Sequence, residues 1–330
     1  KEYRYFVERP IAGEAEYEAA QSLFTSPEAT ARILRIQELV DSHESTLVFV
    51  NSRQNAEMLG LRFTMLKADI GVHHGSLSRE QRHLVEDEFK AGRLKGIVCT
   101  STLELGIDVG SVDLVVQYLS PRQVTPFIQR VGRSGHGIGR VSQGIVITAY
   151  PEDSLEALAV AGRALRRDLE STQIPMMALD VLAHQVAGLV MDFRELPIKE
   201  AHGIVRRAFP YQGLSWEEFL SVVSFLDSLK KVRMEGEILT GTSRTRNYYF
   251  ENLSTIPDER LYLIIDTTTD KRVGVLGEEF MLTKARVGLN FICRGYVWQI
   301  LQIEKDGLVY VKPIDDPTAA IPGWDGEMIP

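Results

Sequence analysis

The chain has 330 residues, of which 45 are acidic and 37 basic, giving a formal net charge of −8 at pH 7. Its 44% hydrophobic and 25% charged residues are typical of a globular protein, and its length exceeds one ordinary core, so we expect two or three domains. No run approaches about 18 consecutive apolar residues and no signal-peptide pattern opens the sequence, which argues against membrane insertion and secretion and predicts a cytoplasmic protein.

The two cysteines, Cys99 and Cys293, are far apart, and Cys99 lies in a hydrophobic run. We therefore expect neither a disulfide framework nor a zinc site, which fits a reducing compartment. The negative net charge argues mildly against nucleic acid as a partner, but binding depends on a local basic track rather than on the sum. Basic residues do cluster at 230–233 and 244–246, while acidic residues crowd the C-terminal quarter.

Residues 1–171 alternate strand and helix signals. Strands are predicted at 3–10, 46–51, a short segment ending at Val72, 96–100, 112–117 and 144–150. One helix is predicted from Ser26, its cap, with Pro27 at the first helical position, to about residue 43, and another ends at about residue 67. A third runs from Ser78 to Ala91, where Ser78 and Gln81 form a capping-box pattern, and a closing helix ends at about residue 170. Continuous apolar strands alternating with helices are typical of a parallel sheet covered on both faces, so we predict an α/β domain.

The pattern changes after residue 171. Three helical patterns, at about 176–192, 198–208 and 215–229, precede a Lys/Arg-rich, β-like segment. Three helices followed by a small wing predict a winged-helix domain over residues 172–246. From 247 to 330, short alternating strands punctuated by glycines predict a small β-barrel domain.

Two polar turns follow strands of the α/β domain. Ser52 and Arg53 stand where a strand ends and a helix begins, where unpaired N–H groups favour phosphate; alternatively, Ser52 caps the helix and Arg53 is solvated. In the turn HHGSLSRE (His73–Glu80), Gly75 lets a phosphate approach the backbone and Ser76 offers a hydroxyl donor. The paired histidines point to opposite sides of an extended chain and lack ligand-spaced partners, so we predict no metal site.

The densest signals lie between Gly96 and His136. Thr100 and Ser101 follow a buried-looking strand, and their hydroxyls suit phosphate oxygens. Gly106-Ile107-Asp108 comes next, and in isolation a surface turn would be the favoured interpretation of Asp108. The segment PFIQRVGRSGH then places Gln129, Arg130 and Arg133 on one short helix. Strands whose carboxyl ends carry small hydroxyls, followed by an arginine-bearing helix, suit an open α/β sheet that binds ligands at that edge.

Together these segments resemble motifs IV, V and VI of superfamily 2 helicases, and the chain specifically resembles the large helicase-related (Lhr) family. The resemblance extends over nearly the whole chain, through RNYYFENLSTIPDE (Arg246–Glu259), GVLGEEF (Gly274–Phe280), GYVW (Gly295–Trp298) and IPGWDGEMIP (Ile321–Pro330). It implies that the α/β domain is the second RecA-like domain of a helicase motor, followed by a winged helix and an Lhr-type β-barrel.

The resemblance also implies an ATP site. Arg133 would be the arginine finger, since a permanently charged fork suits the charge developing on a transferring γ-phosphate, and Gln129 would approach that phosphate or the attacking water. Many superfamily 2 proteins carry arginine where this chain has His136, and a histidine makes this second cation pH-dependent. The residues expected to contact ATP are Gly106, Asp108, Arg130, Arg133 and His136.

For nucleic acid, the expected contacts are Ser52, Arg53, Gly75, Ser76, Thr100, Ser101, Lys230, Lys231, Arg233, Arg244 and Arg246. For the last five of these residues, all of them basic, the alternative is a merely solvated face. Trp216, Trp298 and Trp324 suit base stacking, but core packing is the favoured reading for Trp216 and Trp298.

The chain contains no G-x-x-x-x-G-K-[ST] phosphate loop and no Asp-Glu-x-His segment. The family carries both in a preceding RecA-like domain, so we expect this chain to begin after that domain, to stop before a further helical domain, and to be inactive alone. ATP is the expected cofactor, with Mg²⁺ held by the absent domain.

The predicted function is the C-terminal motor half of an ATP-dependent 3′–5′ helicase or translocase, acting on single-stranded or duplex DNA, or on RNA or an RNA–DNA hybrid, in DNA repair. One alternative is a non-catalytic nucleic-acid binding or strand-annealing module. Another is a protein-assembly scaffold whose motor residues are inactive.

Overall fold

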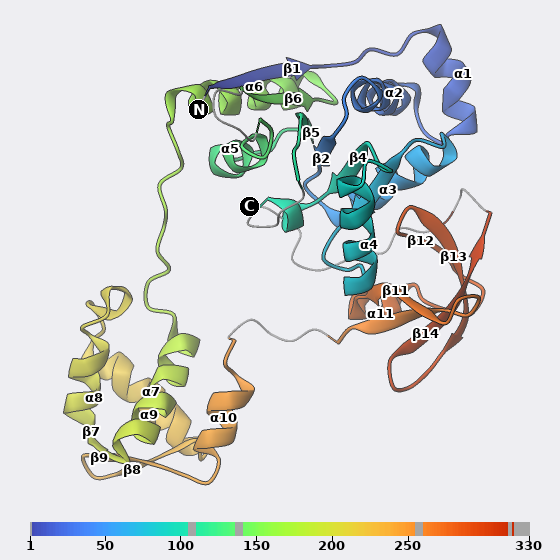
Figure 1. Cartoon of the computed structure of the whole chain (residues 1–330). Coiled ribbons are helices and arrows are strands. Elements are labelled where there is room, and N and C mark those ends of the chain that lie inside the picture. Colours follow the sequence, from blue (N-terminus) through green and yellow to red (C-terminus); the bar gives the residue numbers. More distant parts are fainter. Residues whose placement is uncertain (1, 105–109, 136–140, 255–259, 316–318, 320–330) are drawn as a thin grey trace. The chain divides into compact units, whose positions relative to one another are not determined.

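The computed structural model describes residues 2–104, 110–135, 141–254, 260–315 and 319 (Figure 1). The chain folds into two compact units. Unit 1 comprises Lys1–Glu170 and Glu259–Pro330, and unit 2 comprises Ser171–Asp258. Within the described residues, no helix is both long and apolar enough to span a bilayer.

Unit 1 contains a six-stranded sheet in the order β1-β6-β5-β2-β4-β3, and all its neighbouring strands pair in parallel. Its strands are β1 (Tyr3–Glu8), β2 (Thr46–Phe49), β3 (Ile70–His73), β4 (Gly96–Cys99), β5 (Leu114–Tyr118) and β6 (Ser142–Ile147). The strands β2, β4 and β5 are buried along their whole length, as expected when helices cover both faces of a parallel sheet.

The two faces of this sheet have separate cores. On one face, Val48 and Val116 pack with α2 (Pro27–Asp41) and α3 (Arg53–Met65). On the other, Leu47 and Phe49 pack with α4 (Arg79–Lys90), α5 (Val124–Val131) and α6 (Pro151–Arg166). This arrangement confirms the predicted RecA-like α/β class, and the free, buried Cys99 lies within it. The short helices α1 (Glu14–Ser22) and η1 (Ser101–Leu103) were not predicted.

The C-terminal strands form a mixed five-stranded sheet in the order β11-β10-β14-β13-β12, in which only β10 and β14 pair in parallel. Its elements are β10 (Tyr262–Asp266), β11 (Lys271–Leu276), α11 (Glu278–Thr283), β12 (Asn290–Cys293), β13 (Tyr296–Ile303) and β14 (Leu308–Ile314). Register shifts after Ile264 and after Ile300 curl this sheet, which agrees with the predicted barrel-like fold.

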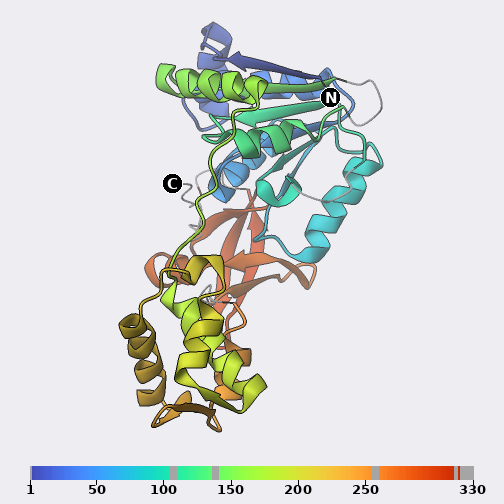
Figure 2. The same ribbon diagram turned by 90° about the vertical axis from the view of Figure 1, so that its left-hand side faces the viewer.

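This curled sheet shares its core with the RecA-like domain. Phe291, Trp298 and Ile300 belong to the same buried cluster as Ile36 of α2 and Phe63 of α3. In Figure 2, which turns the view by 90°, the orange-to-red sheet adjoins the blue-to-teal body. Core packing is therefore confirmed for Trp298, which is buried and donates its indole N–H to the carbonyl of Cys293 at 2.8 Å.

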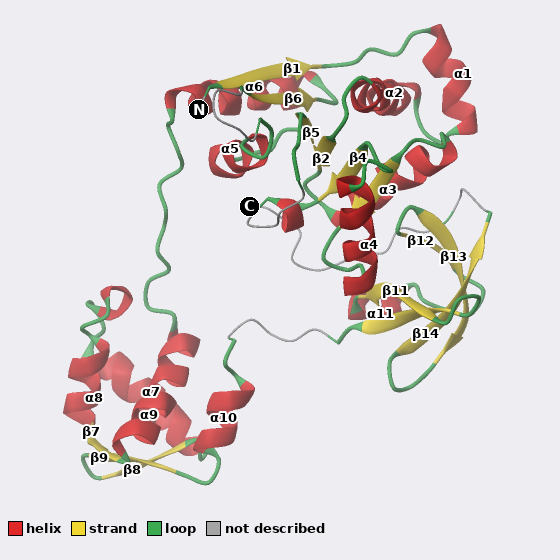
Figure 3. Ribbon diagram, viewed as in Figure 1, coloured by secondary structure: helices red, strands yellow, loops and turns green. Residues whose placement is uncertain are grey.

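Unit 2 is a winged helix, as predicted. Its elements are α7 (Leu179–Phe193), β7 (Glu195–Pro197), α8 (Ile198–Val205), η2 (Phe209–Tyr211), α9 (Trp216–Ser228), β8 (Val232–Glu235), β9 (Ile238–Gly241) and α10 (Thr245–Glu251). The strands form an antiparallel sheet in the order β7-β9-β8, gathered at one end of the helices in Figure 3. The additional helix α10 stacks Tyr249 on His184 of α7, with ring centroids 4.3 Å apart.

Because the two sheets of unit 1 share a core, we expect Phe291→Ala to destabilise both together, by about 3–5 kcal/mol. Phe291 is fully buried in the shared cluster. Phe219→Ala, which removes an equally buried ring from unit 2, is the matched control. In Phe291→Ala, amide hydrogen exchange should show β2 and β5 losing protection together with β12, at a lower urea concentration than in the parent. In Phe219→Ala, these three strands should keep the protection that they have in the parent. Unchanged protection of β2 in Phe291→Ala would contradict the shared core.

Candidate nucleotide and nucleic-acid site

Polar residues gather at the carboxyl edge of the parallel sheet. The predicted residues Ser52 and Arg53 follow β2, Gly75 and Ser76 follow β3, and Thr100 and Ser101 follow β4. Since the carboxyl ends of parallel strands share one edge, this topology brings them to one side of the sheet, where open α/β sheets bind ligands.

At the start of α3, Ser52 Oγ accepts the backbone N–H of Asn55 at 3.1 Å. The capping alternative for Ser52 is thus realised, and its contact with nucleic acid stays a prediction. Arg53 is more than a solvated cation, because its Nη1 donates to Ser76 Oγ at 3.0 Å. Ser76 is only 2% exposed, whereas its neighbour Gly75 is exposed.

Both histidines of the following turn are buried and occupied. His73 Nδ1 lies 2.9 Å from Thr102 Oγ1, and its Nε2 lies 2.9 Å from Glu86. Burial lowers the pKa of His73 below its usual range, and the Glu86 carboxylate only partly offsets that effect. His74 Nε2 lies 2.7 Å from Glu57. Among the residues that the structure describes, no group of three or more His, Cys, Asp or Glu side chains is arranged to hold a metal ion.

After β4, the two predicted hydroxyl residues differ in exposure. Thr100 is nearly buried, and its backbone N–H donates to the carbonyl of His73 at 3.4 Å. Ser101 is exposed at the first position of η1. Of the two, Ser101 has the more accessible hydroxyl.

Arg130 of α5 is an internal residue with 3% of its surface exposed. Its Nε donates to Glu104 Oε2 at 2.9 Å, and its Nη1 donates to Gln117 Oε1 at 2.9 Å and to Asn51 Oδ1 at 3.2 Å. Its guanidinium also lies 5.5 Å from the ring centroid of Phe49. Arg130 therefore ties α5 to three neighbouring segments, and a contact with ATP, which stays a prediction, would require it to leave these partners.

Arg133 lies just beyond α5 and is partly exposed. Its Nε donates to the backbone carbonyl of Glu104 at 3.0 Å, so Glu104 holds Arg130 through its carboxylate and Arg133 through its backbone. The guanidinium is thus neither enclosed by its own domain nor turned away from the segment that follows β4. The predicted ATP contacts Gly106, Asp108 and His136 lie outside the described residues.

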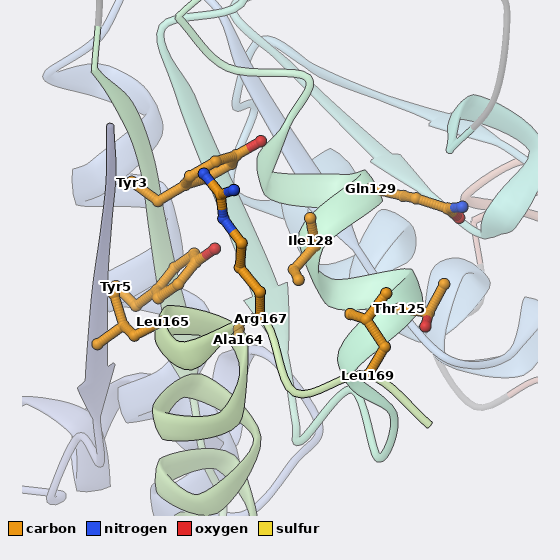
Figure 4. Close-up of a pocket in the computed structure, with 9 residues that line it drawn as sticks. All are labelled: Tyr3, Tyr5, Thr125, Ile128, Gln129, Ala164, Leu165, Arg167 and Leu169. Atoms are coloured by element: carbon orange, nitrogen blue, oxygen red, sulfur yellow. The ribbon is translucent and has the colours of Figure 1, made fainter. Parts of the chain in front are cut away.

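Gln129 is exposed on α5 and lines a cavity of about 530 Å³ (Figure 4). The side chain of Gln129 points away from Arg167 on the opposite wall. The other lining residues are Tyr3, Tyr5, Thr125, Ile128, Ala164, Leu165, Arg167 and Leu169. The cavity lies between β1, α5, α6 and the segment that follows α6.

Glu170 caps the N-terminus of α5. Its carboxylate accepts the backbone N–H groups of Val124 at 2.6 Å and Thr125 at 3.1 Å, and the Thr125 hydroxyl at 3.0 Å. Burial alone would raise the pKa of Glu170, but these hydrogen bonds outweigh it and lower the pKa to about 2. Glu170, the last residue of the N-terminal segment of unit 1, therefore anchors α5, the helix that carries Gln129 and Arg130.

In unit 2, the five predicted cations fall into two groups. Lys230, Arg233 and Arg244 line one polar hollow of about 670 Å³ beside the wing. The Lys231 ammonium instead lies 5.2 Å from the ring centroid of Tyr248, and the Arg246 guanidinium 5.8 Å from that of Phe250. The first group offers a shared surface for phosphate, whereas the second covers aromatic rings of α10.

Two family models match the chain. One, described as the helicase conserved C-terminal domain, matches residues 28–137, and the other, described as the large helicase-related protein winged helix domain, matches residues 163–321. The chain belongs to the Lhr family. Among Lhr relatives, it is 35% identical to the ATP-dependent helicase Lhr-Core protein 2 of Thermococcus barophilus, covering 97% of this chain and 38% of that protein.

Solved structures agree with this assignment. The structure of Mycobacterium smegmatis helicase Lhr bound to ssDNA and AMP-PNP matches with a TM-score of 0.64 and 31% identity, over 79% of this chain and 35% of that one. The helicase MrfA bound to DNA and AMPPNP matches with a TM-score of 0.65, over 95% of this chain and 42% of that one; at 19% identity it shows the fold alone. The chain spans less than half of each of these relatives.

Several residues that build the site in this Lhr chain were missed by the sequence analysis: Asn51, Glu57, Glu86, Glu104, Gln117 and Glu170. One local signal existed, because Gln117 is a polar residue inside an otherwise apolar strand. Glu57 gave a weaker one, as a carboxylate on a helix whose neighbouring residues Ala56 and Leu59 are buried. The partners of the others are remote in sequence.

We expect Glu170→Gln to destabilise unit 1 by about 1 kcal/mol at pH 7, as loss of an N-cap does. The pKa of Glu170 is lowered from 4.5 to about 2, so its contribution is complete above about pH 4.5 and is lost as the pH falls toward 2. Urea unfolding at several pH values should show the difference from the parent shrinking over that range. Asp168→Asn, at an exposed ion pair two residues earlier, is the control. A pH-independent difference would contradict the capping role.

Proposed function

We propose that this chain is the C-terminal motor half of an ATP-dependent 3′–5′ helicase or translocase. The observation that carries the proposal is Arg133, which is partly exposed and is oriented by the backbone carbonyl of Glu104, in the segment that follows β4 of a RecA-like sheet. A permanently charged guanidinium in such a position suits the γ-phosphate of a nucleotide held by a second RecA-like domain.

In this proposal, Gln129 and Arg133 complete a nucleotide site from one side, and Mg²⁺ is held with ATP by the other domain. Bound ATP would supply the free energy for the cycle of domain closure and opening. The residues of this chain orient the triphosphate and sense its hydrolysis, since Arg133 shares Glu104 with the Arg130 network. Closure and opening of the two domains would then shift the grip on the nucleic acid.

For the nucleic acid, we propose DNA, single-stranded or duplex, with RNA–DNA hybrids as a further substrate and repair in the cytoplasm as the setting. The Mycobacterium smegmatis relative bound to ssDNA and AMP-PNP supports DNA as the partner. In this chain, the exposed Gly75 and Ser101, the neighbouring Arg53, and the Lys230–Arg233–Arg244 hollow would contact phosphates. Phosphate contacts are independent of base sequence, so we expect little sequence preference.

The decisive experiment is Arg133→Ala in a protein that contains both RecA-like domains. An arginine finger contributes roughly a thousandfold or more to kcat, so we expect ATP turnover to fall by about that factor while affinity for single-stranded DNA stays within about twofold. Arg163→Ala, which removes an exposed arginine paired with Asp168, should leave turnover unchanged.

The 330-residue chain alone is the negative control, because it carries neither the phosphate loop nor the Asp-Glu-x-His segment. Unchanged unwinding by Arg133→Ala would defeat the finger assignment. Single-strand binding without any ATP-driven movement would instead favour the annealing module.

The hollow in unit 2 gives a separate prediction. If Arg244 neutralises one phosphate, Arg244→Ala should reduce the slope of log affinity for single-stranded DNA against log salt by about 0.7. The control is Lys199→Ala, which removes an exposed lysine paired with Glu237. Fluorescence anisotropy with an oligonucleotide across a salt series measures both. If the affinity of the parent chain for single-stranded DNA does not change with salt concentration, the result would favour the scaffold function instead.

A further inference from the structure

The residues from His74 to Ser78, here named loop 74–78, are held from two sides. This loop follows β3 at the sheet edge and contains Gly75 and Ser76, the predicted nucleic-acid contacts. On one side it contacts α3, and on the other it contacts the five-stranded sheet, whose strands lie almost 200 or more residues later in the sequence. The consequence drawn below rests on the proposed function.

The first attachment runs through Glu57 of α3, which is completely buried. Its Oε1 accepts the backbone N–H of Arg294 at 2.6 Å, and its Oε2 accepts that of Gly295 at 2.6 Å. The same carboxylate lies 2.7 Å from His74 Nε2. One buried carboxylate therefore joins the turn between β12 and β13 to the first residue of loop 74–78.

His74 passes this connection into the loop. Its Nδ1 accepts the backbone N–H of Ser76 at 3.3 Å, so the proton of the neutral ring is assigned to Nε2, which donates to Glu57. Ser76 Oγ in turn accepts from Arg53 at 3.0 Å. Each member of this chain of hydrogen bonds fixes the orientation of the next.

The second attachment is a short stretch of strand pairing with β11. The carbonyl of Ser76 accepts the N–H of Val275 at 2.9 Å, and the N–H of Ser78 donates to the carbonyl of Val273 at 3.2 Å. Leu77 and Gly274 form an antiparallel bridge between them. A Cβ at Gly274 would lie only 2.6 Å from the Ser76 carbonyl oxygen, so the close approach requires glycine.

We propose that the five-stranded sheet is a positioning element for nucleic-acid binding by the RecA-like domain, and that Glu57 is the positioning residue that couples the two. From His73 to Leu77, Gly75 alone is exposed, and it lies between the two attachments. The sheet thus presents one glycine backbone to a phosphate while it restrains the residues on either side. Holding the loop in advance removes an ordering cost from binding.

The test uses Glu57→Gln in the 330-residue chain. Glutamine has the same shape, but its amide nitrogen would face a backbone N–H donor, so at least one of the donors Arg294, Gly295 and His74 loses its acceptor. We expect faster amide hydrogen exchange in loop 74–78, and roughly tenfold weaker binding of a single-stranded oligonucleotide at low salt, equal to about 1.4 kcal/mol. The slope of affinity against salt should change little, because no cation is removed.

Val311→Ala is the matched control. Val311 is fully buried in β14, which pairs with β10 and β13, so its truncation weakens the same sheet by opening a cavity. Urea titrations compare the stabilities of the two variants. A general loss of stability predicts equal effects of both on binding, whereas positioning predicts an effect of Glu57→Gln alone.

Gly274→Ala approaches the loop from the other side and keeps the carboxylate intact. Its new methyl group displaces Ser76 from β11, so it should reproduce the faster loop exchange and the weaker binding even if Glu57→Gln folds poorly. Parent-like binding and loop exchange in both folded variants would overturn the inference. If the parent chain binds no single strand at low salt, the proposed function fails, and loop exchange in the variants still reports whether the sheet restrains loop 74–78.

Discussion

The arrangement of the segments at the edge of the sheet depends on the hydrogen bonds that the buried guanidinium of Arg130 donates. It bonds to Glu104 after β4, to Gln117 at the end of β5 and to Asn51 after β2, and so fixes three neighbouring segments to α5. Removing the Glu104 carboxylate would leave the buried charge of Arg130 without its ion-pair partner, which typically costs about 3–5 kcal/mol. Because the Glu104 carbonyl also accepts from Arg133, the position of the proposed arginine finger follows from the Arg130 network.

The motif residues separate into two classes once their burial is known. Arg130, Ser76, Thr100 and both histidines are buried or nearly so, and their hydrogen bonds are to this chain. Gly75, Ser101 and Gln129 are exposed, and Arg133 is partly exposed. The same short motifs therefore contain both exposed groups, which we propose to contact a ligand, and buried groups that hold them in place.

The sequence was sufficient for the features that depend on local pattern. The apolar runs of β2, β4 and β5 and the cap at Ser26 predicted a parallel sheet with helices on both faces, and three helices with a wing were recognised after residue 171. The helices α1, α10 and α11 were not predicted. At Ser78, the predicted capping box is half present: Ser78 Oγ accepts the N–H of Gln81. Glu57 and Arg294 lie 237 positions apart, so no local pattern could pair them.

The chain enters and leaves unit 2 close in sequence to residues that make these long-range contacts. The chain leaves unit 1 at Glu170, whose carboxylate caps α5, the helix that ends beside Arg133. It returns at Glu259 and forms β10 and then β11, the strand that bridges loop 74–78. The winged helix is therefore inserted between two anchors, one on the helix of the proposed nucleotide site and one beside the proposed nucleic-acid loop.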